Sequence, residues 1–168
     1  TTERCVFKRI NYFKSNDLKI DRVYFSNDLN KNTQAYSTAF FLTTAGDLYS
    51  CGYNTGGECG IGNTTHPQTT PSKVSNIGAG TSPGAVVDFW NMANYEGNTS
   101  YAKCADGKVY GWGDNESYQL GDGTNTNRSA PAEIPALSGT IKMVGFNGFT
   151  YYSSGWGGNG THSFNFAL

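Results

Sequence analysis

Few residues of this chain have side chains that could do chemistry, and two of them, Cys51 and Cys59, lie close together in the glycine-rich stretch CGYNTGGECGIG. Two thiols at this spacing could form a disulfide, carry out redox chemistry or bind a metal ion. A zinc site needs about four ligands, and His66 is the nearest further candidate in the sequence. The other two cysteines are Cys5 and Cys104, and the sequence alone does not fix which thiols pair.

The two histidines do not lie in a catalytic context. His66 stands in a polar loop beside Pro67, where we expect it to be exposed to solvent, and we expect His162 to have a structural role. Neither is accompanied by the Ser or Cys and the Asp that nucleophilic catalysis needs. The sequence therefore predicts no catalytic residue, no cofactor and no enzymatic activity.

Three acidic residues, Asp114, Glu116 and Asp122, gather in the stretch GDNESYQLGDG and could suggest calcium. Their spacing does not match the ligand positions of a calcium-binding loop. Short acidic side chains also favour tight turns by bonding to nearby backbone groups. We therefore expect these residues to shape turns, and we expect no metal ion.

The glycine-rich stretch is one copy of a repeat, because residues 45–71 align with residues 106–131. Turn-type residues match between the copies at a constant spacing of 61 residues: Gly46 with Gly107, Gly52 with Gly113, Asn54 with Asn115, and Gly60 with Gly121. In this alignment Cys51 falls on Trp112 and Cys59 falls on Leu120. The thiols thus stand at apolar positions, which favours buried free cysteines over a Cys51–Cys59 disulfide, a metal site or a redox pair.

The composition indicates an all-β fold with many tight turns. The 168 residues include 22 Gly, 11 Tyr and 10 Phe, and no long segment shows an apolar period of 3.6 residues. Asp and Gly stand between alternating apolar runs at 45–47 and 106–108, which predicts a β-hairpin in each copy. We expect one repeat domain over 1–168, with repeat 1 at about 12–76, repeat 2 at about 77–136 and a partial third repeat at about 137–168.

The second copy resembles the repeat of the regulator of chromosome condensation family. The matching residues are Asp106, Gly107, Tyr110, Trp112, Gly113, Asn115, Gln119, Leu120, Gly121 and Gly123. The first copy has Cys51 and Cys59 in place of Trp and Leu, and Glu58 in place of Gln. Tyr118 stands where the family usually has Gly, which puts the conformation of that turn in question.

This resemblance implies a β-propeller, in which four-stranded blades stack around a central axis. Two complete repeats and a partial third cannot close a ring, so further sequence or other chains must complete it. Three chains with two blades each would close one ring, and a homotrimer is therefore the expected partner state. The activity of the family's founding member, nucleotide exchange on a nuclear GTPase, is not carried over, because fold does not imply function.

Charge and loop composition lead to the expected function. The net charge is −1 with 15% charged residues and no basic patch or long apolar run, so we expect neither nucleic-acid binding nor membrane insertion. The long loops combine aromatic rings with amides, a composition suited to binding glycan or protein. The candidate binding residues are Trp90, Asn91, Tyr95, Tyr151, Tyr152 and Trp156. Low charge and richness in Asn, Gly, Thr and Tyr favour a virion or extracellular appendage resembling a tail fibre, which would bind host-surface glycan or protein. The alternative is a cytoplasmic scaffold propeller that binds a partner protein.

Overall fold

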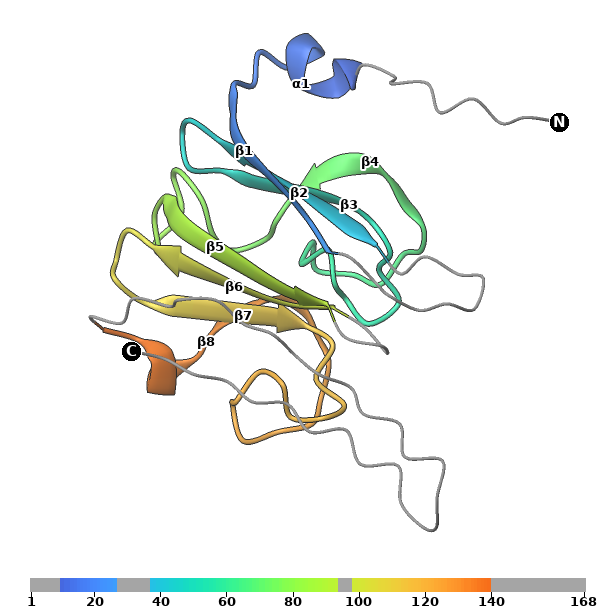
Figure 1. Cartoon of the computed structure of the whole chain (residues 1–168). Helices are drawn as coiled ribbons and strands as arrows, with labels where there is room; N and C mark the ends of the chain where they lie inside the picture. The colour runs from blue at the N-terminus through green and yellow to red at the C-terminus, as the bar shows by residue number, and fades with distance from the viewer. Residues whose placement is uncertain (1–9, 27–36, 94–97, 140–168) are drawn as a thin grey trace, which may run out of the picture.

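The computed structural model describes residues 10–26, 37–93 and 98–139, which form two four-stranded antiparallel sheets (Figure 1). The strands of sheet A, in spatial order, are β1 (Ile20–Phe25), β2 (Thr38–Thr43), β3 (Leu48–Gly52) and β4 (Gln68–Lys73). Those of sheet B are β5 (Val86–Ala93), β6 (Asn98–Cys104), β7 (Val109–Gly113) and β8 (Arg128–Glu133). The all-β prediction is confirmed.

Two short helical segments accompany the sheets. The helix α1 (Asn11–Ser15) precedes β1, and a 3-10 turn, η1 (Pro135–Leu137), follows β8. A helix of five residues is too short to show an apolar period, which is why the sequence did not predict α1. Within the described ranges no helix is long and apolar enough to cross a membrane.

The sheets are two copies of one structure. In sheet A, Phe41 pairs with Tyr49, and in sheet B their counterparts Ala102 and Tyr110 form the same pair. Each predicted hairpin is present: the amide of Thr43 donates to Asp47 O at 2.8 Å, and the amide of Cys104 makes the equivalent bond to Lys108 at 3.0 Å. The repeat read from the sequence is therefore a repeat of backbone structure.

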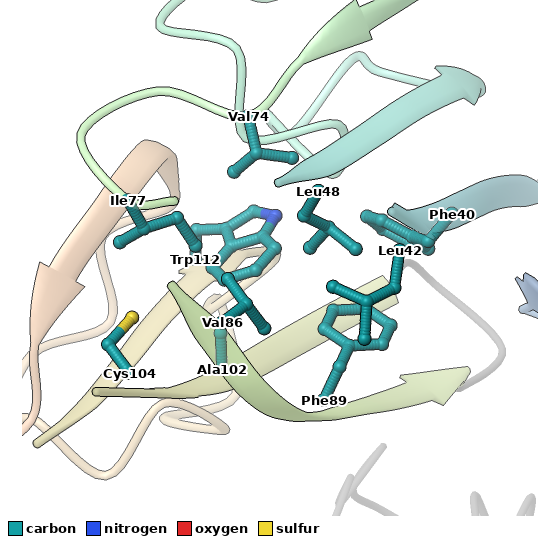
Figure 2. Close-up of a cluster of buried hydrophobic side chains, with 10 residues drawn as sticks. All are labelled: Phe40, Leu42, Leu48, Val74, Ile77, Val86, Phe89, Ala102, Cys104 and Trp112. Atoms are coloured by element: carbon teal, nitrogen blue, oxygen red, sulfur yellow. The ribbon is translucent and has the colours of Figure 1, made fainter. Parts of the chain in front are cut away.

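The largest apolar cluster joins the two sheets (Figure 2). Its buried members are Phe40, Leu42, Leu48, Val74, Ile77, Val86, Phe89, Ala102, Cys104 and Trp112. The Phe40 ring of sheet A lies with its centroid 4.7 Å from that of Phe89 in sheet B, and Trp112 is fully buried beside both. Neither sheet could keep these side chains from water without the other, so the sheets are neighbouring blades.

Sheet B carries a second buried cluster on its other face. Its members are Met92, Tyr101, Val109, Leu120 and Ile134. Successive side chains of a strand point to opposite faces, so Tyr101 belongs to this cluster while Ala102 faces sheet A. Both faces of sheet B are thus apolar, as in a blade with a neighbour on each side.

The fold is a β-propeller type of repeat with two blades among the described residues, and these blades do not close a ring. The chain therefore has the predicted fold class. Apart from its first residues, the expected third copy at 137–168 lies outside the described residues.

We predict unequal effects of the same substitution at Gly46 and Gly107. Both residues have positive φ, 84° and 82°. A Cβ on Gly46 would clash with Ala85 and Val86 at the junction of the blades, whereas one on Gly107 would meet no atom within 4 Å. Gly107→Ala should cost about 1–2 kcal/mol of unfolding free energy through its backbone conformation alone. Gly46→Ala should cost at least about 1 kcal/mol more, because the junction must also shift.

Urea unfolding of the two single variants and the unchanged chain measures this difference. Each position serves as the control for the other, since their backbone conformations match. Equal destabilisation by the two substitutions would contradict the close packing of Gly46 against Ala85.

Candidate functional site

The loops that join the third and fourth strands of each blade are held by the same set of hydrogen bonds in both blades. We call residues 53–67, between β3 and β4, glycine loop 1, and residues 114–127, between β7 and β8, glycine loop 2. Both leave their sheet at the same end, because the strands of the two blades are equivalent. Each loop is long for a connection between neighbouring strands, and such loops often carry function.

One buried asparagine holds each glycine loop together. Asn54 Nδ2 donates to the carbonyls of Asn63 and Thr65 at 3.0 and 3.2 Å, and its Oδ1 accepts the Cys59 amide at 2.9 Å. In glycine loop 2, Asn115 makes the same three contacts. They are with Thr124 O at 2.8 Å, Thr126 O at 3.2 Å and the Leu120 amide at 2.8 Å. Both asparagine residues are 0% exposed.

The backbone of each anchoring asparagine is bound from the far end of its loop. The Asn54 amide donates to His66 Nδ1 at 3.3 Å, and the Asn115 amide donates to Asn127 Oδ1 at 2.7 Å. His66 is exposed, as the sequence predicted, but it also closes its loop. The sequence alone did not reveal this role, because it becomes visible only when His66 is aligned with its counterpart Asn127.

A third pair of equivalent contacts involves Glu58 and Gln119. Glu58 Oε2 accepts the Gly56 amide at 2.9 Å, and Gln119 Oε1 accepts the Ser117 amide at 2.8 Å. Glu58 is 1% exposed, and its burial raises the pKa of the carboxyl group. The side-chain carboxylate of Glu58 thus makes the contact that the side-chain amide of Gln119 makes in glycine loop 2, each with the backbone amide two residues before it.

Glycine loop 1 lies against the next blade. The indole Nε1 of Trp112 donates to Glu58 O at 3.1 Å, and the Gly62 amide donates to Ser129 O at 2.8 Å. A Cβ on Gly60 would come within 2.5 Å of that indole nitrogen, so the loop is in close contact with the ring. The loop is therefore part of the joint between the blades as well as a surface.

Tyr118 is the largest difference between the two loops. It stands at the position of Gly57 and keeps the same left-handed conformation, with φ of 61° against 86°. The departure from the family pattern thus leaves the turn intact. A positive φ is uncommon for an aromatic residue and costs about 1–2 kcal/mol. The side chain is 60% exposed, so this strained position presents an aromatic ring to solvent.

The described cysteines are free thiols. Cys59 and Cys104 are buried, and burial raises the pKa of each thiol to about 12. Cys51 is half-buried, and burial raises its pKa as well. The prediction of buried free thiols is confirmed for Cys59, whereas Cys51 is free but only half-buried, and Cys5 lies outside the described residues.

Two acidic residues of glycine loop 2, Asp114 and Asp122, are engaged within the protein: Asp114 Oδ2 accepts a hydrogen bond from Gln119 Nε2 at 2.6 Å. Asp122 Oδ1 accepts the amide and hydroxyl of Thr124, both at 2.8 Å, and Oδ2 lies 2.5 Å from Arg128 Nη2. Burial raises the pKa of Asp122, but the bonds from Thr124 and the charge of Arg128 outweigh it and leave the pKa lowered. Within the described ranges, no group of three or more His, Cys, Asp or Glu is arranged to hold a metal ion.

The structure places two of the six candidate binding residues. Trp90 and Asn91 lie in β5, so they point to opposite faces of sheet B. Trp90 packs against the second apolar cluster, and Asn91 Nδ2 donates to Ser100 Oγ at 2.8 Å. The structure does not bring these two together on one loop surface. The other four lie outside the described residues: Tyr95, Tyr151, Tyr152 and Trp156.

Stacked four-stranded blades with one repeated loop define the class of this chain as a β-propeller repeat protein. A family model described as "Regulator of chromosome condensation (RCC1) repeat" matches residues 45–88 and 106–157, more than half of the chain. The chain belongs to the RCC1 repeat family.

The relatives with similar sequences are much longer proteins. The "RCC1-like G exchanging factor-like protein" of Mus musculus is 35% identical over 112 residues, which are 66% of this chain and 23% of that protein. The "E3 ubiquitin-protein ligase HERC2" of Homo sapiens is 34% identical over 108 residues, which are 64% of this chain and 2% of that protein. The chain thus spans less than a quarter of either relative.

Solved structures share the fold. The crystal structure of human WBSCR16 is 26% identical, with a TM-score of 0.55 over 75% of this chain and 28% of that one. The structure of Prp20p from Saccharomyces cerevisiae gives 21% identity and a TM-score of 0.51 over 70% of this chain and 26% of that one. The identity to Prp20p supports a common fold alone.

These comparisons overturn the functional interpretation of the sequence. The prediction of a virion appendage that binds host-surface glycan or protein was wrong, because the relatives are RCC1-like proteins of mouse and human. The expected homotrimer has no support among them. The error came from composition: Asn and Gly serve the turns of the two glycine loops, and their abundance does not indicate a virion. The expectation of no enzymatic activity receives mixed support, since the relatives include an exchange factor-like protein and a ligase.

We predict that Asn115→Ala destabilises the chain by about 2–3 kcal/mol, because it leaves the buried Leu120 amide and two carbonyls without their partner. Asn125→Ala in the same loop should change the unfolding free energy by less than about 0.5 kcal/mol, since Asn125 is exposed. Chemical denaturation followed by circular dichroism compares the two. A loss no larger for Asn115→Ala than for Asn125→Ala would contradict the anchoring role.

We predict that the native protein reacts with iodoacetamide at Cys51 at least about tenfold faster than at Cys59 or Cys104 at pH 8. The pKa of about 12 leaves the two buried thiols almost wholly protonated, and both are out of reach of the reagent. Peptide mass spectrometry at timed intervals gives the rates. In guanidinium the three should react alike, and faster native labelling of Cys59 than of Cys51 would contradict the burial described.

Proposed function

We propose that the chain is part of an intracellular RCC1-type β-propeller that binds a protein partner without making or breaking covalent bonds. The proposal rests mainly on Tyr118, a ring that is 60% exposed on a loop whose backbone is fixed from within. A rigid, exposed aromatic residue loses little conformational entropy on binding, and tyrosine is common among residues that dominate protein interfaces.

The strain at Tyr118 supports a role in binding. The equivalent position in glycine loop 1 is Gly57, which suits a positive φ without cost. A tyrosine in this conformation lowers stability and makes no contribution to an apolar cluster of the described residues. Backbone strain of this kind is often retained at sites where the side chain has a function.

The name of the mouse relative suggests the class of partner to test first, a small GTP-binding protein. An exchange factor must bind the nucleotide-free form of its partner more tightly than the nucleotide-bound form, because coupling between two ligands is reciprocal.

We also propose that the chain consists of repeat 1 at 12–76, repeat 2 at 77–136 and part of a third repeat at 137–168.

A binding assay with the immobilised chain tests the proposal, with small GTP-binding proteins as probes in their GDP-bound and nucleotide-free forms. We expect preference for a nucleotide-free form, and a loss of at least about tenfold in affinity for Tyr118→Gly. Asn125→Ala should bind as the unchanged chain does. Because Tyr118→Gly also relieves strain, its unfolding free energy should stay equal or rise by about 1 kcal/mol.

This pairing separates binding from folding, since a variant that is at least as stable but binds less has lost a contact and not its fold. Equal binding by the Tyr118→Gly variant, or no binding to any protein probe, would overturn the proposal.

A further inference from the structure

Glycine loop 1 buries a carboxyl group in the joint between the blades. Glu58 is 1% exposed, and its own backbone carbonyl accepts the indole N–H of Trp112 at 3.1 Å. The same loop holds sheet B through Gly62, whose amide donates to Ser129 O at 2.8 Å. An ionised carboxylate loses its hydration when it is buried, which costs free energy unless other groups compensate its charge. The protonation state of Glu58 therefore bears directly on the contact between the loop and sheet B.

Glycine loop 2 has a neutral side chain at the same position. Gln119 Oε1 accepts the Ser117 amide at 2.8 Å, and its Nε2 donates to Asp114 Oδ2 at 2.6 Å. Glu58 keeps the first kind of contact, with the Gly56 amide at 2.9 Å, but an ionised carboxylate has no hydrogen to donate. Only the protonated form of Glu58 matches both the charge and the donor of Gln119.

The surroundings of Glu58 favour its protonated form. Burial raises the pKa of its carboxyl group, and the negative charge of Asp114, which is 5% exposed at the start of glycine loop 2, raises this pKa further. Hydrogen bonds from backbone amides of glycine loop 1, including that of Gly56, lower the pKa but do not outweigh burial. Two buried carboxyl groups from different blades thus act on one another across the joint.

Two other ionisable side chains of the described residues lie near this contact. Cys59 follows Glu58 in the loop, and because burial raises the pKa of its thiol to about 12, it stays uncharged. Arg128 begins β8, which lies against the loop, but its guanidinium pairs with Asp122. Within the described part of the second blade, Asp114 is therefore the charged group that acts on Glu58.

We propose that the joint between the blades is a pH-sensitive contact, in which glycine loop 1 holds sheet B more firmly when Glu58 is protonated than when it is ionised. The folded chain keeps the Glu58 proton at a pH where the unfolded chain has lost it. This contribution to stability is therefore present below the ordinary glutamate pKa of 4.5 and is lost as the pH rises through the raised pKa of the folded chain. Raising the pH thus loosens the joint, and lowering it tightens the joint.

Urea unfolding of the unchanged chain and of Glu58→Gln tests the proposal. The ratio of their unfolding constants, unchanged chain over variant, should grow at least about fivefold between about pH 4.5 and about pH 8, because glutamine cannot ionise. Taking the ratio cancels the contributions of all other ionisable groups. Glu116→Gln is the matched control, since it removes the same charge from an exposed position of glycine loop 2, and its ratio should stay constant over this range.

Hydrogen exchange followed by NMR measures the joint itself. In the unchanged chain, the protection of the Gly62 amide and of the Trp112 indole N–H, relative to intrinsic exchange at each pH, should fall several-fold over the same range. In Glu58→Gln this protection should stay constant. The measurement separates a loosened joint from a change in global stability, because it follows two bonds that cross from one blade to the other.

Asp114→Asn removes the like charge from the second blade and should reduce the pH dependence of both measurements. This variant keeps the test informative if Glu58→Gln does not fold. The proposal is refuted if the ratio for Glu58→Gln does not change with pH, or changes no more than the ratio for Glu116→Gln. It is also refuted if the two protection factors of the unchanged chain stay constant over this range.

Discussion

The structure depends on one constraint, that a four-stranded blade with two apolar faces cannot keep either of them from water alone. The cluster that contains Trp112, Phe40 and Phe89 is built from both sheets and belongs to neither. Glycine loop 1 extends the same joint, because it contacts the Trp112 ring and its Glu58 carbonyl accepts a hydrogen bond from the indole N–H. The stability of each blade is therefore a property of the pair, as in other repeat proteins.

The loops obey a different rule, since one buried asparagine in each loop binds backbone groups of the same loop. Asn54 and Asn115 each bind three backbone groups of their own loop, and the far end of the loop binds the asparagine in turn. The bonds from the Cys59 and Leu120 amides are buried, where an unpaired amide is most costly. The chain thus combines apolar contacts and a few hydrogen bonds between blades with a hydrogen-bonded asparagine inside each loop.

Much of this architecture could be predicted because it repeats. Turn-type matches at one spacing located both hairpins and both loops, and aligning Cys59 with Leu120 identified a buried free thiol. What the sequence did not predict lies where one copy has no counterpart. Among the described residues the helix α1 has no counterpart ahead of sheet B, and it is too short to show a period.

The candidate site was harder to predict for a related reason. Trp90 was assigned to a loop because Asn and Gly follow it, but β5 continues to Ala93 and turns the ring toward an apolar cluster. His66 was judged by its own neighbours, although its function appears only beside Asn127. The prediction of a virion appendage from composition was wrong, since proteins with unrelated functions share the residue types that tight turns require.

The asparagine that organises each glycine loop from inside has an evolutionary consequence. A loop that satisfies its own backbone can change its outer residues without disturbing the blade beneath it, and positions such as Tyr118 and Asn125 are free to diverge between copies. Duplication of such a blade therefore supplies a second loop whose exposed residues can change while the strands of the blade stay the same. The same property makes each loop, from its anchoring asparagine to the residue that binds the asparagine amide, a natural unit for grafting a new recognition sequence.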